Sequence, residues 1–310
     1  MRKSYFFLMV SLLCCFFFSH IEGVNYQLIQ DLGSSARMIG LGNIEGFSAD
    51  SSVVFDNPAG MYRMKRSSMS FFTASVMMGE VNYNQISLAT PTTYGTFGIA
   101  YMEAGVYDFS HTGLINTGVI EKAVFLHTFD YKSTVMKLSY QNQVQPNVYY
   151  GVTGTLYGAR FYDTIASGSN MDFGLIFDLR PVVVSLMVRN MIAGSQVDFR
   201  SPSGNAGEVL PTEVILATRY AAKELQLYGQ YKYTQDKGLF STGVSYSPAF
   251  SPMFEFLGGY KNYLVLGDIR SGLTCGVGLK FRPITIYYSF EKSDYFQNDN
   301  KNYFSMSIEI

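Results

Sequence analysis

The chain has 310 residues and a formal net charge of −1, with 15% charged residues against 16% aromatic ones. A near-neutral charge provides no basic face, which excludes nucleic acid as a partner. Of the three cysteines, Cys14 and Cys15 lie in an apolar N-terminal run and only Cys275 lies beyond it. An intrachain disulfide and a cysteine metal cluster are therefore excluded once that run is removed.

Residues 1–23 have the pattern of an export signal. Arg2 and Lys3 precede the apolar run 5–18, and we expect cleavage after Gly23. Two alternatives are lipidation of a cysteine in that run, although neither cysteine follows a small residue, and an uncleaved anchor. A spanning helix needs about 20 apolar residues, and no later run reaches that length. A membrane-embedded mature chain would therefore be a closed barrel.

Residues 24–66 differ from everything that follows them. Glycine and other small residues dominate the first half, where Gly40 and Gly42 suit backbone that lies close to other backbone. The element Asn57-Pro58-Ala59-Gly60 predicts a turn or a helix start, because proline restricts φ and asparagine bonds its own backbone. We expect a compact, non-repeating segment ahead of the strands.

From Ser67 onward the hydrophobic period is two. Leu225, Leu227 and Tyr231, for example, alternate with Gln226 and Gln230. The pattern predicts strands at 67–78, 81–91, 95–109, 130–144, 147–162, 168–178, 181–190, 212–220, 222–233, 238–247, 252–261, 269–281, 283–292 and 302–310. Residues 119–129 could form a further strand, and 147–162 shows no clean face. The prediction is an all-β fold, a transmembrane antiparallel β-barrel of about fourteen strands over residues 67–310.

The predicted connections support this fold. Outer-membrane barrels alternate short turns with longer loops. The long connections, 110–129, 191–211 and 293–301, all follow odd-numbered strands, and the short link 79–80 is the exception. The alternative is a pair of soluble β-sandwich domains, which would carry more charge on their outer faces.

Such a barrel is too wide for its own side chains to fill, since about eight strands already enclose a packed interior. Residues 24–66 are long enough to enter it, which predicts an N-terminal plug. The lumen face is fairly polar, and this weighs against a purely apolar conduit. The residues predicted on it are Lys137, Asp172, Asp178, Gln226, Gln230, Glu255, Lys280 and Glu309.

The N-terminal residues also carry a resemblance. The run Ser34 to Gly42, then Ala49-Asp50, then Asn57-Pro58-Ala59-Gly60 resembles the N-terminal signature of the PorV/PorQ branch of FadL-like outer-membrane barrels. Asn43 and Ser51 depart from it, since a glycine and an acidic residue are usual there. The resemblance implies a 14-stranded barrel of the bacterial outer membrane that works with type IX secretion partners. The alternative is a FadL-type transporter of small hydrophobic compounds.

The partners that follow are outer-membrane lipid, together with secretion components or a hydrophobic small molecule. Asn57, Pro58, Ala59 and Gly60 then form either a gate that seats a ligand or a structural turn into the first strand. The resemblance further implies a kink in the third strand that opens the wall sideways. Gly98, Glu103 and Gly105 are its candidate bulge, because interior glycines mark bends.

Catalysis has little support. His111 and His127 are the histidines after the signal, and Ser110 lies beside the first of them. Adjacency in sequence does not make the geometry of a catalytic triad, and loop histidines are commonly just exposed. We predict no enzyme, no cofactor and no metal site.

Overall fold

The computed structural model describes residues 32–76, 79–116, 121–202, 204–265, 267–292 and 300–310, with only the backbone described over 109–123. The predicted signal peptide, residues 1–23, lies outside the described residues. Among the described residues, no helix has the length and apolar character to cross a membrane. Three short helical turns precede the strands: α3 (Ala36–Gly40), η1 (Ser51–Val54) and η2 (Pro58–Arg63).

Strands make up the rest of the described chain. Their bounds are β1 (Ser68–Val76), β2 (Val81–Thr92), β3 (Gly95–Asn116), β4 (Glu121–Gln145), β5 (Val148–Phe161), β6 (Thr164–Leu179), β7 (Val182–Arg189), β8 (Gln196–Ser201), β9 (Gly204–Val209), β10 (Glu213–Ala222), β11 (Leu225–Thr234), β12 (Lys237–Tyr246), β13 (Phe254–Val265), β14 (Asp268–Phe281), β15 (Ile284–Glu291) and β16 (Lys301–Glu309).

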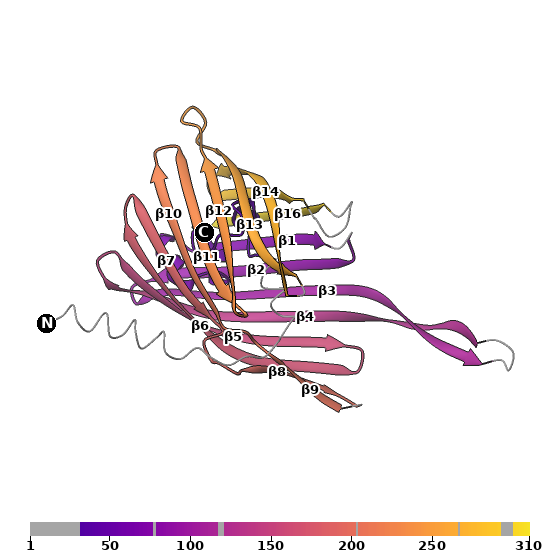
Figure 1. Ribbon diagram of the computed structural model, residues 1–310. Coiled ribbons are helices and arrows are strands. Elements are labelled where there is room, and N and C mark those ends of the chain that lie inside the picture. The colour runs from indigo at the N-terminus through magenta and orange to yellow at the C-terminus, as the bar shows by residue number, and fades with distance from the viewer. Residues whose placement is uncertain (1–31, 77–78, 117–120, 203, 266, 293–299) are drawn as a thin grey trace.

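Fourteen strands close an antiparallel barrel, which confirms the predicted fold (Figure 1). The ring runs from β1 to β7 and then from β10 to β16, and β16 pairs with β1. The other two strands, β8 and β9, form a hairpin that pairs with the first residues of β6, beyond the end of β7. Closure leaves the strands of the ring with neighbours on both sides, so the barrel itself has no open sheet edge.

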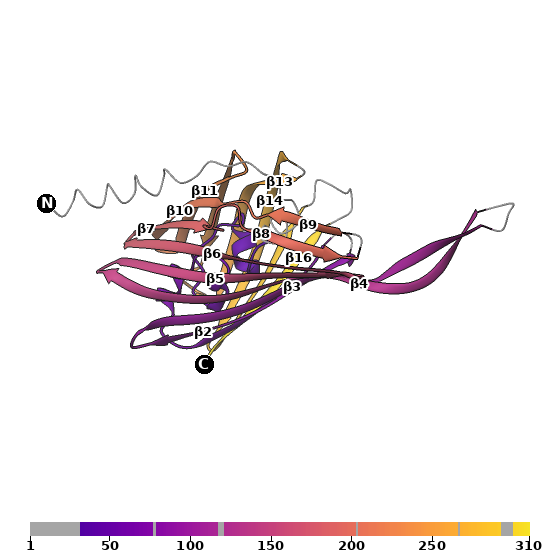
Figure 2. The same cartoon turned by 90° about the horizontal axis from the view of Figure 1, so that it is seen from below.

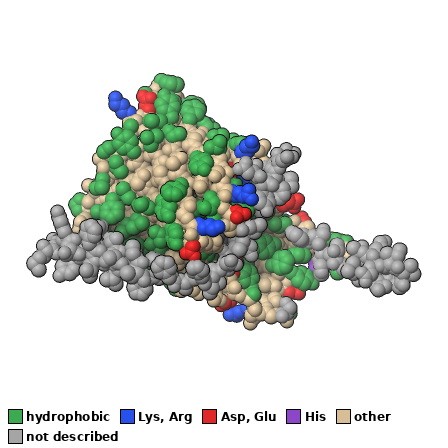
Figure 3. Space-filling model, in the orientation of Figure 1, with side chains coloured by type: hydrophobic (Ala, Val, Ile, Leu, Met, Phe, Trp, Pro, Cys, Tyr) green, Lys and Arg blue, Asp and Glu red, His purple; other side chains and the backbone are tan. Residues whose placement is uncertain are grey.

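Alternation decides which side chains face the interior. On β11, Leu227 and Tyr231 are exposed on the outside, whereas Tyr228 and Gln230 are buried inside. The predicted faces of this strand are therefore confirmed. The outer surface is rich in Phe, Tyr, Leu and Ile, and hydrophobic side chains are spread over the face seen in Figure 3, where charged ones are few.

The wall is uneven in height. β3 and β4 have 22 and 25 residues, but β15 and β16 have 8 and 9. The hairpin of β3 and β4 consequently projects far beyond the rim (Figures 1 and 2). The predicted long connection 110–129 is thus mostly strand, and residues 121–129 begin β4 instead of forming a strand of their own. Main-chain pairing can extend a hairpin whatever its side-chain pattern.

Other connections also differ from the prediction. The turns after β5 and β11 contain two residues each, Tyr162-Asp163 and Gln235-Asp236, where longer loops were expected. The predicted connection 191–211 holds the β8–β9 hairpin. Short and long connections are therefore less clearly separated between the two ends of the barrel than the sequence predicts, because the strands extend further than their alternating patterns indicate. β5, predicted without a clean face, alternates regularly between buried and more exposed positions.

Residues 32–66, called the N-terminal segment below, lie inside the ring (Figures 1 and 2). From 33 to 64 only Ala49 is exposed. α3 contacts β13 to β16, whereas η2 contacts β4 to β6 on another part of the wall. The N-terminal segment therefore runs across the barrel and supplies apolar side chains, including Ile39, Val53 and Met61, to a core that the strands share.

Candidate functional site

The candidate site is the interface between the N-terminal segment and the barrel wall. Each helical turn of the segment begins at a polar cap, which satisfies an N–H group that a helix start leaves without a partner. The capping oxygens belong to Ser35, Asp50 and Asn57, and they accept from the backbone N–H groups of Met38, Ser52 and Ala59 at 3.2, 3.0 and 3.0 Å. Pro58 occupies the first turn of η2, where a missing N–H costs nothing.

Asn57 also joins the segment to the wall. Its amide nitrogen Nδ2 donates to Ser185 Oγ at 2.8 Å, to the Leu186 carbonyl at 3.1 Å and to the Leu175 carbonyl at 3.4 Å. The side chain is fully buried. One asparagine thus caps η2 and connects it to β6 and β7.

Wall glycines allow this close approach. A Cβ atom at Gly174 would lie 1.9 Å from Asn57 Oδ1, and one at Gly151 would lie 2.4 Å from the Ala59 nitrogen. Gly60 is itself packed against Val53, at 2.5 Å from its ideal Cβ position to Cγ2. A larger residue at Gly151 would force the two backbones apart, and one at Gly174 or Gly60 would displace the side chain of Asn57 or Val53.

A second such contact lies around Gly42. Its φ of +81° favours glycine, and its N–H donates to Thr274 Oγ1 at 3.1 Å. A Cβ at Gly259 would lie 2.1 Å from the Gly42 nitrogen, and one at Gly40 would lie 2.6 Å from Ser289 Oγ. Asn43, which departs from the signature, has φ of 62°, a left-handed conformation that asparagine tolerates.

Buried ion pairs add to the interface. The Arg37 guanidinium donates to Glu255 at 3.0 Å and to the Tyr228 hydroxyl at 2.9 Å. Glu45 pairs with Arg189 on β7, which also donates to Glu213 at 2.6 Å. Removing one partner of a buried pair typically costs 3–5 kcal/mol, because it leaves an uncompensated charge. These pairs therefore specify where the N-terminal segment lies.

The wall carries further polar contacts on its inner face. Lys137 donates to Asp172 at 2.7 Å, and Lys261 donates to Glu291 at 2.8 Å. Among the predicted lumen residues, those buried inside are Lys137, Asp172, Asp178, Gln230 and Glu255, whereas Gln226 is partly exposed and Lys280 is exposed. Glu309 has the inward parity but lies at the end of β16, where it is exposed.

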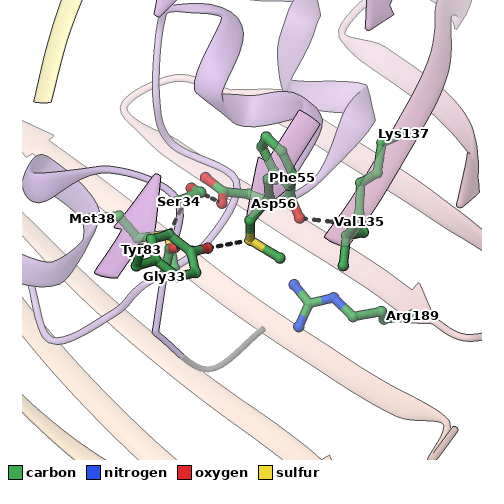
Figure 4. Close-up of a pocket in the computed structure, with 10 residues that line it drawn as sticks. Gly33, Ser34, Met38, Phe55, Asp56, Tyr83, Val135, Lys137 and Arg189 are labelled. Carbon is green, nitrogen blue, oxygen red and sulfur yellow. Dashed lines mark hydrogen bonds between the residues drawn. The ribbon is translucent and has the colours of Figure 1, made fainter. Parts of the chain in front are cut away.

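A small cavity of about 20 Å³ lies between the segment and the wall (Figure 4). Asp56 and Arg189 line it, and the Ser34 hydroxyl donates to Asp56 Oδ1. Asp56 Oδ2 and Arg189 Nε have no hydrogen-bond partner among the described residues. Burial, followed by the charge of Glu45, raises the pKa of Asp56 to about 8. A cavity of this size has room for about one water molecule.

The candidate bulge residues lie in regular sheet. β3 pairs continuously with β2 and β4 at Gly98, Glu103 and Gly105, and its first register shift follows between Val106 and Phe109. The inner side of Gly98 faces the N-terminal segment, since a Cβ there would lie 2.5 Å from Val54 Cγ2. The Glu103 carboxylate accepts on the outside from the hydroxyl groups of Tyr101 and Tyr107, at 2.9 and 2.7 Å.

The remaining candidates form no recognisable centre. His127 stacks on Tyr162, with ring centroids 5.4 Å apart, and the side chains of Ser110 and His111 lie outside the described residues. No group of three potential metal ligands occurs in the described part of the chain. Sequence reasoning missed Glu45, Asp56 and Arg189. Arg189 could have been found from the sequence, because it follows the run 182–188, which is apolar except for Ser185.

A scan against protein-family models finds no match, and neither does a search of curated proteins. Solved structures do match. The toluene transporter TodX of P. putida has 12% sequence identity and a TM-score of 0.62, over 90% of this chain and 99% of TodX. The toluene transporter TbuX of Ralstonia pickettii has 10% identity and a TM-score of 0.56, over 90% and 98% of the two chains. A FadL homologue of Pseudomonas aeruginosa has 10% identity and a TM-score of 0.58, over 88% and 97%.

The chain has the fold of the FadL-like barrels. These neighbours are described as transporters or as a FadL homologue, so they support the FadL-like part of the sequence resemblance. The FadL-like fold does not distinguish the PorV/PorQ branch, and that narrower assignment remains a prediction.

Proposed function

We propose that this chain is an outer-membrane barrel that admits small hydrophobic compounds, with residues 24–66 as its plug. The observation that carries the proposal is a FadL-like ring of fourteen strands whose interior holds a buried N-terminal segment. TodX and TbuX are toluene transporters, and both match nearly their full length with this chain. The resemblance in fold favours transport over a catalytic function.

The outer surface supports placement in a membrane. A spanning strand needs about 9–11 residues, a length that β1, β10 and β16 match with 9, 10 and 9. Their outward positions carry apolar side chains such as Leu216 and Phe304. After removal of the export signal, we expect the mature chain in the bacterial outer membrane, with lipid around it.

Plugging is tested by deleting residues 24–60. The wall is held by its own pairing, so the ring should persist and conduct ions in planar bilayers, whereas the intact chain should stay closed. Heat-dependent mobility on a gel checks that the barrel is folded. A folded deletion variant as closed as the intact chain would rule out the plug.

The inner wall bears on the route of a hydrophobic compound. Ion pairs such as Lys137–Asp172 make the lumen polar, so an apolar solute is better accommodated by leaving sideways into lipid. We place that exit along β3 between Gly98 and Gly105, where β2 and β4 would separate from it. The continuous pairing there corresponds to a closed wall.

A disulfide across this part of the wall tests the exit. Asn84 and Glu103 lie opposite each other on β2 and β3, so cysteines there should lock the two strands together. The matched control places cysteines at Leu216 and Tyr231, opposite each other on β10 and β11, and both variants carry Cys275→Ala. Oxidation should stop uptake of a hydrophobic dye only in the first. Equal uptake in both would exclude this route.

The PorV/PorQ prediction rests on the residues from Ser34 to Gly60. Asn57 and Gly42, within that run, pack the N-terminal segment on the wall, a role that needs no secretion partner. Isolation of the native protein from outer membranes separates the two functions. Co-purified secretion components would favour the PorV/PorQ role, and their absence together with dye uptake would favour transport.

A further inference from the structure

An apolar groove of about 600 Å³ lies on the outer surface of strands β2 to β5. Its walls include Leu88, Ile99, Leu138 and Val152. The register explains its shape: Leu88, Ile99, Leu138 and Gly154 stand opposite one another in a single row across the four strands. Met171 continues that row on β6. Gly154 is therefore a gap in a row of large apolar side chains.

Nothing in the described part of the chain requires glycine at position 154. Its backbone lies outside the left-handed region, and a Cβ atom there would meet nothing within 4 Å. At Gly98, Gly151 and Gly174 the reason is visible, because the N-terminal segment packs on them from inside. An interior strand glycine often marks a bulge, a bend or a site where a ligand or another backbone comes close, and the register is continuous through Gly154. Gly154 points outward, so its neighbour must come from outside the barrel.

The surroundings of the groove indicate the chemistry of that neighbour. None of the described residues that line it is charged, and its volume lies within the range of about 300–1,000 Å³ typical of ligand sites. Polar groups gather toward the β2–β3 turn, where the Tyr140 hydroxyl and the Asn142 amide donate to the Tyr94 carbonyl at 2.6 and 3.1 Å. The groove is thus apolar along its length and polar at one end, as an amphipathic lipid is.

We propose that this groove binds one acyl chain of a membrane phospholipid. The chain lies over Gly154 between Leu138 and Val152, and the lipid headgroup lies near Tyr94 and Tyr140. The β2–β3 turn lies at the rim opposite the projecting β3–β4 hairpin, and the longer connections of outer-membrane barrels are external, which places the lipid in the periplasmic leaflet. The site rests on the proposed membrane location but does not depend on transport.

Photo-crosslinking in nanodiscs tests the site. The probe is a phosphatidylethanolamine with a diazirine on one acyl chain. Trypsin releases residues 138–160, which hold five groove positions, and residues 224–232 from the distant strand β11. In the unmodified protein, peptide 138–160 should carry more label than peptide 224–232.

Variants fill the groove without touching the interior. Gly154→Leu places a side chain in the gap, and Gly154→Ala is a milder change for which folding is not in question. Gly229→Leu is the matched control, since Gly229 points outward on β11 between Thr218 and Thr242. Loss of the contact of about one methylene group corresponds to roughly fourfold weaker binding. Label on peptide 138–160 should fall about that much in Gly154→Leu, less in Gly154→Ala, and not in Gly229→Leu.

Three outcomes would overturn the proposal. The first is label spread evenly over both peptides. The second is displacement of the label by toluene, which would indicate that the groove takes a free hydrocarbon in place of a lipid chain. The third is a change in oligomeric state in Gly154→Leu, which would indicate that a second copy of the protein occupies the groove. Dye uptake is measured in parallel. Absent uptake with the expected label would reject transport and leave the lipid site standing, whereas normal uptake with even label would do the reverse.

Discussion

Replacing Asn57 with alanine should release the N-terminal segment from the wall. The side chain accepts one hydrogen bond, from the Ala59 N–H group, and its two amide hydrogens donate to Ser185 and Leu186, with a longer contact to the Leu175 carbonyl. A net contribution of about 1 kcal/mol for each of the three bonds gives about 3 kcal/mol. That energy corresponds to a rise of roughly 150-fold in the ratio of released to seated segment.

The assay is single-channel conductance in planar bilayers. Asn57→Ala should open intermittently to the level of the variant that lacks residues 24–60, while the unmodified barrel stays closed. Ser185→Ala removes one of the three hydrogen bonds, and its opening should be rarer. Asn84→Ala is the control, because Asn84 accepts from Thr73 on the outer face, away from the segment.

Asn57→Ala must also keep a folded ring, as judged by heat-dependent gel mobility. A folded variant that is as closed as the unmodified protein would refute the reasoning. The segment would then be held by its ion pairs and apolar packing alone.

Three more predictions concern the same interface. Gly259→Ala brings a Cβ to 2.1 Å from the Gly42 nitrogen, an overpacking that should cost about 1–3 kcal/mol. The N-terminal segment should therefore become more sensitive to protease. Gly154→Ala is the control, and its protease sensitivity should equal that of the unmodified protein. Arg189→Met leaves the buried Glu45 without its ion-pair partner, whereas Glu213 keeps Lys232. The change should destabilise the seated segment by about 3–5 kcal/mol, seen as frequent channel opening; unchanged gating would count against an anchoring role. Seating raises the pKa of Asp56 from its ordinary 3.8 to about 8, so the stabilisation by the neutral form is complete below the lower value and is lost progressively as the pH rises to the higher one. Opening should therefore increase between about pH 4 and about pH 8 and level off above it, and Asp56→Asn should abolish that dependence.

The strand pattern of this chain could be predicted because a barrel strand has one apolar and one polar side. Leu225 to Lys232 shows that alternation openly, and the structure confirms it. The alternation ends before the main-chain pairing does, so the height of the β3–β4 hairpin and the turn after β5 could not be predicted. Hydrogen bonds between backbones leave little trace in the order of side chains.

Composition and alternation by themselves determined an all-β chain whose width calls for a filled interior. Only the tertiary structure decided which groups meet inside it. Asn57 reaches Ser185 across 128 positions of sequence, and Arg189 reaches Glu45 across 144. The register of fourteen strands brings such residues together, and register depends on the closure of the whole ring. The same closure places Gly154 between Leu138 and Met171 on the neighbouring strands, where it leaves a gap in the apolar surface. The residues next to Gly154 in sequence do not reveal this gap.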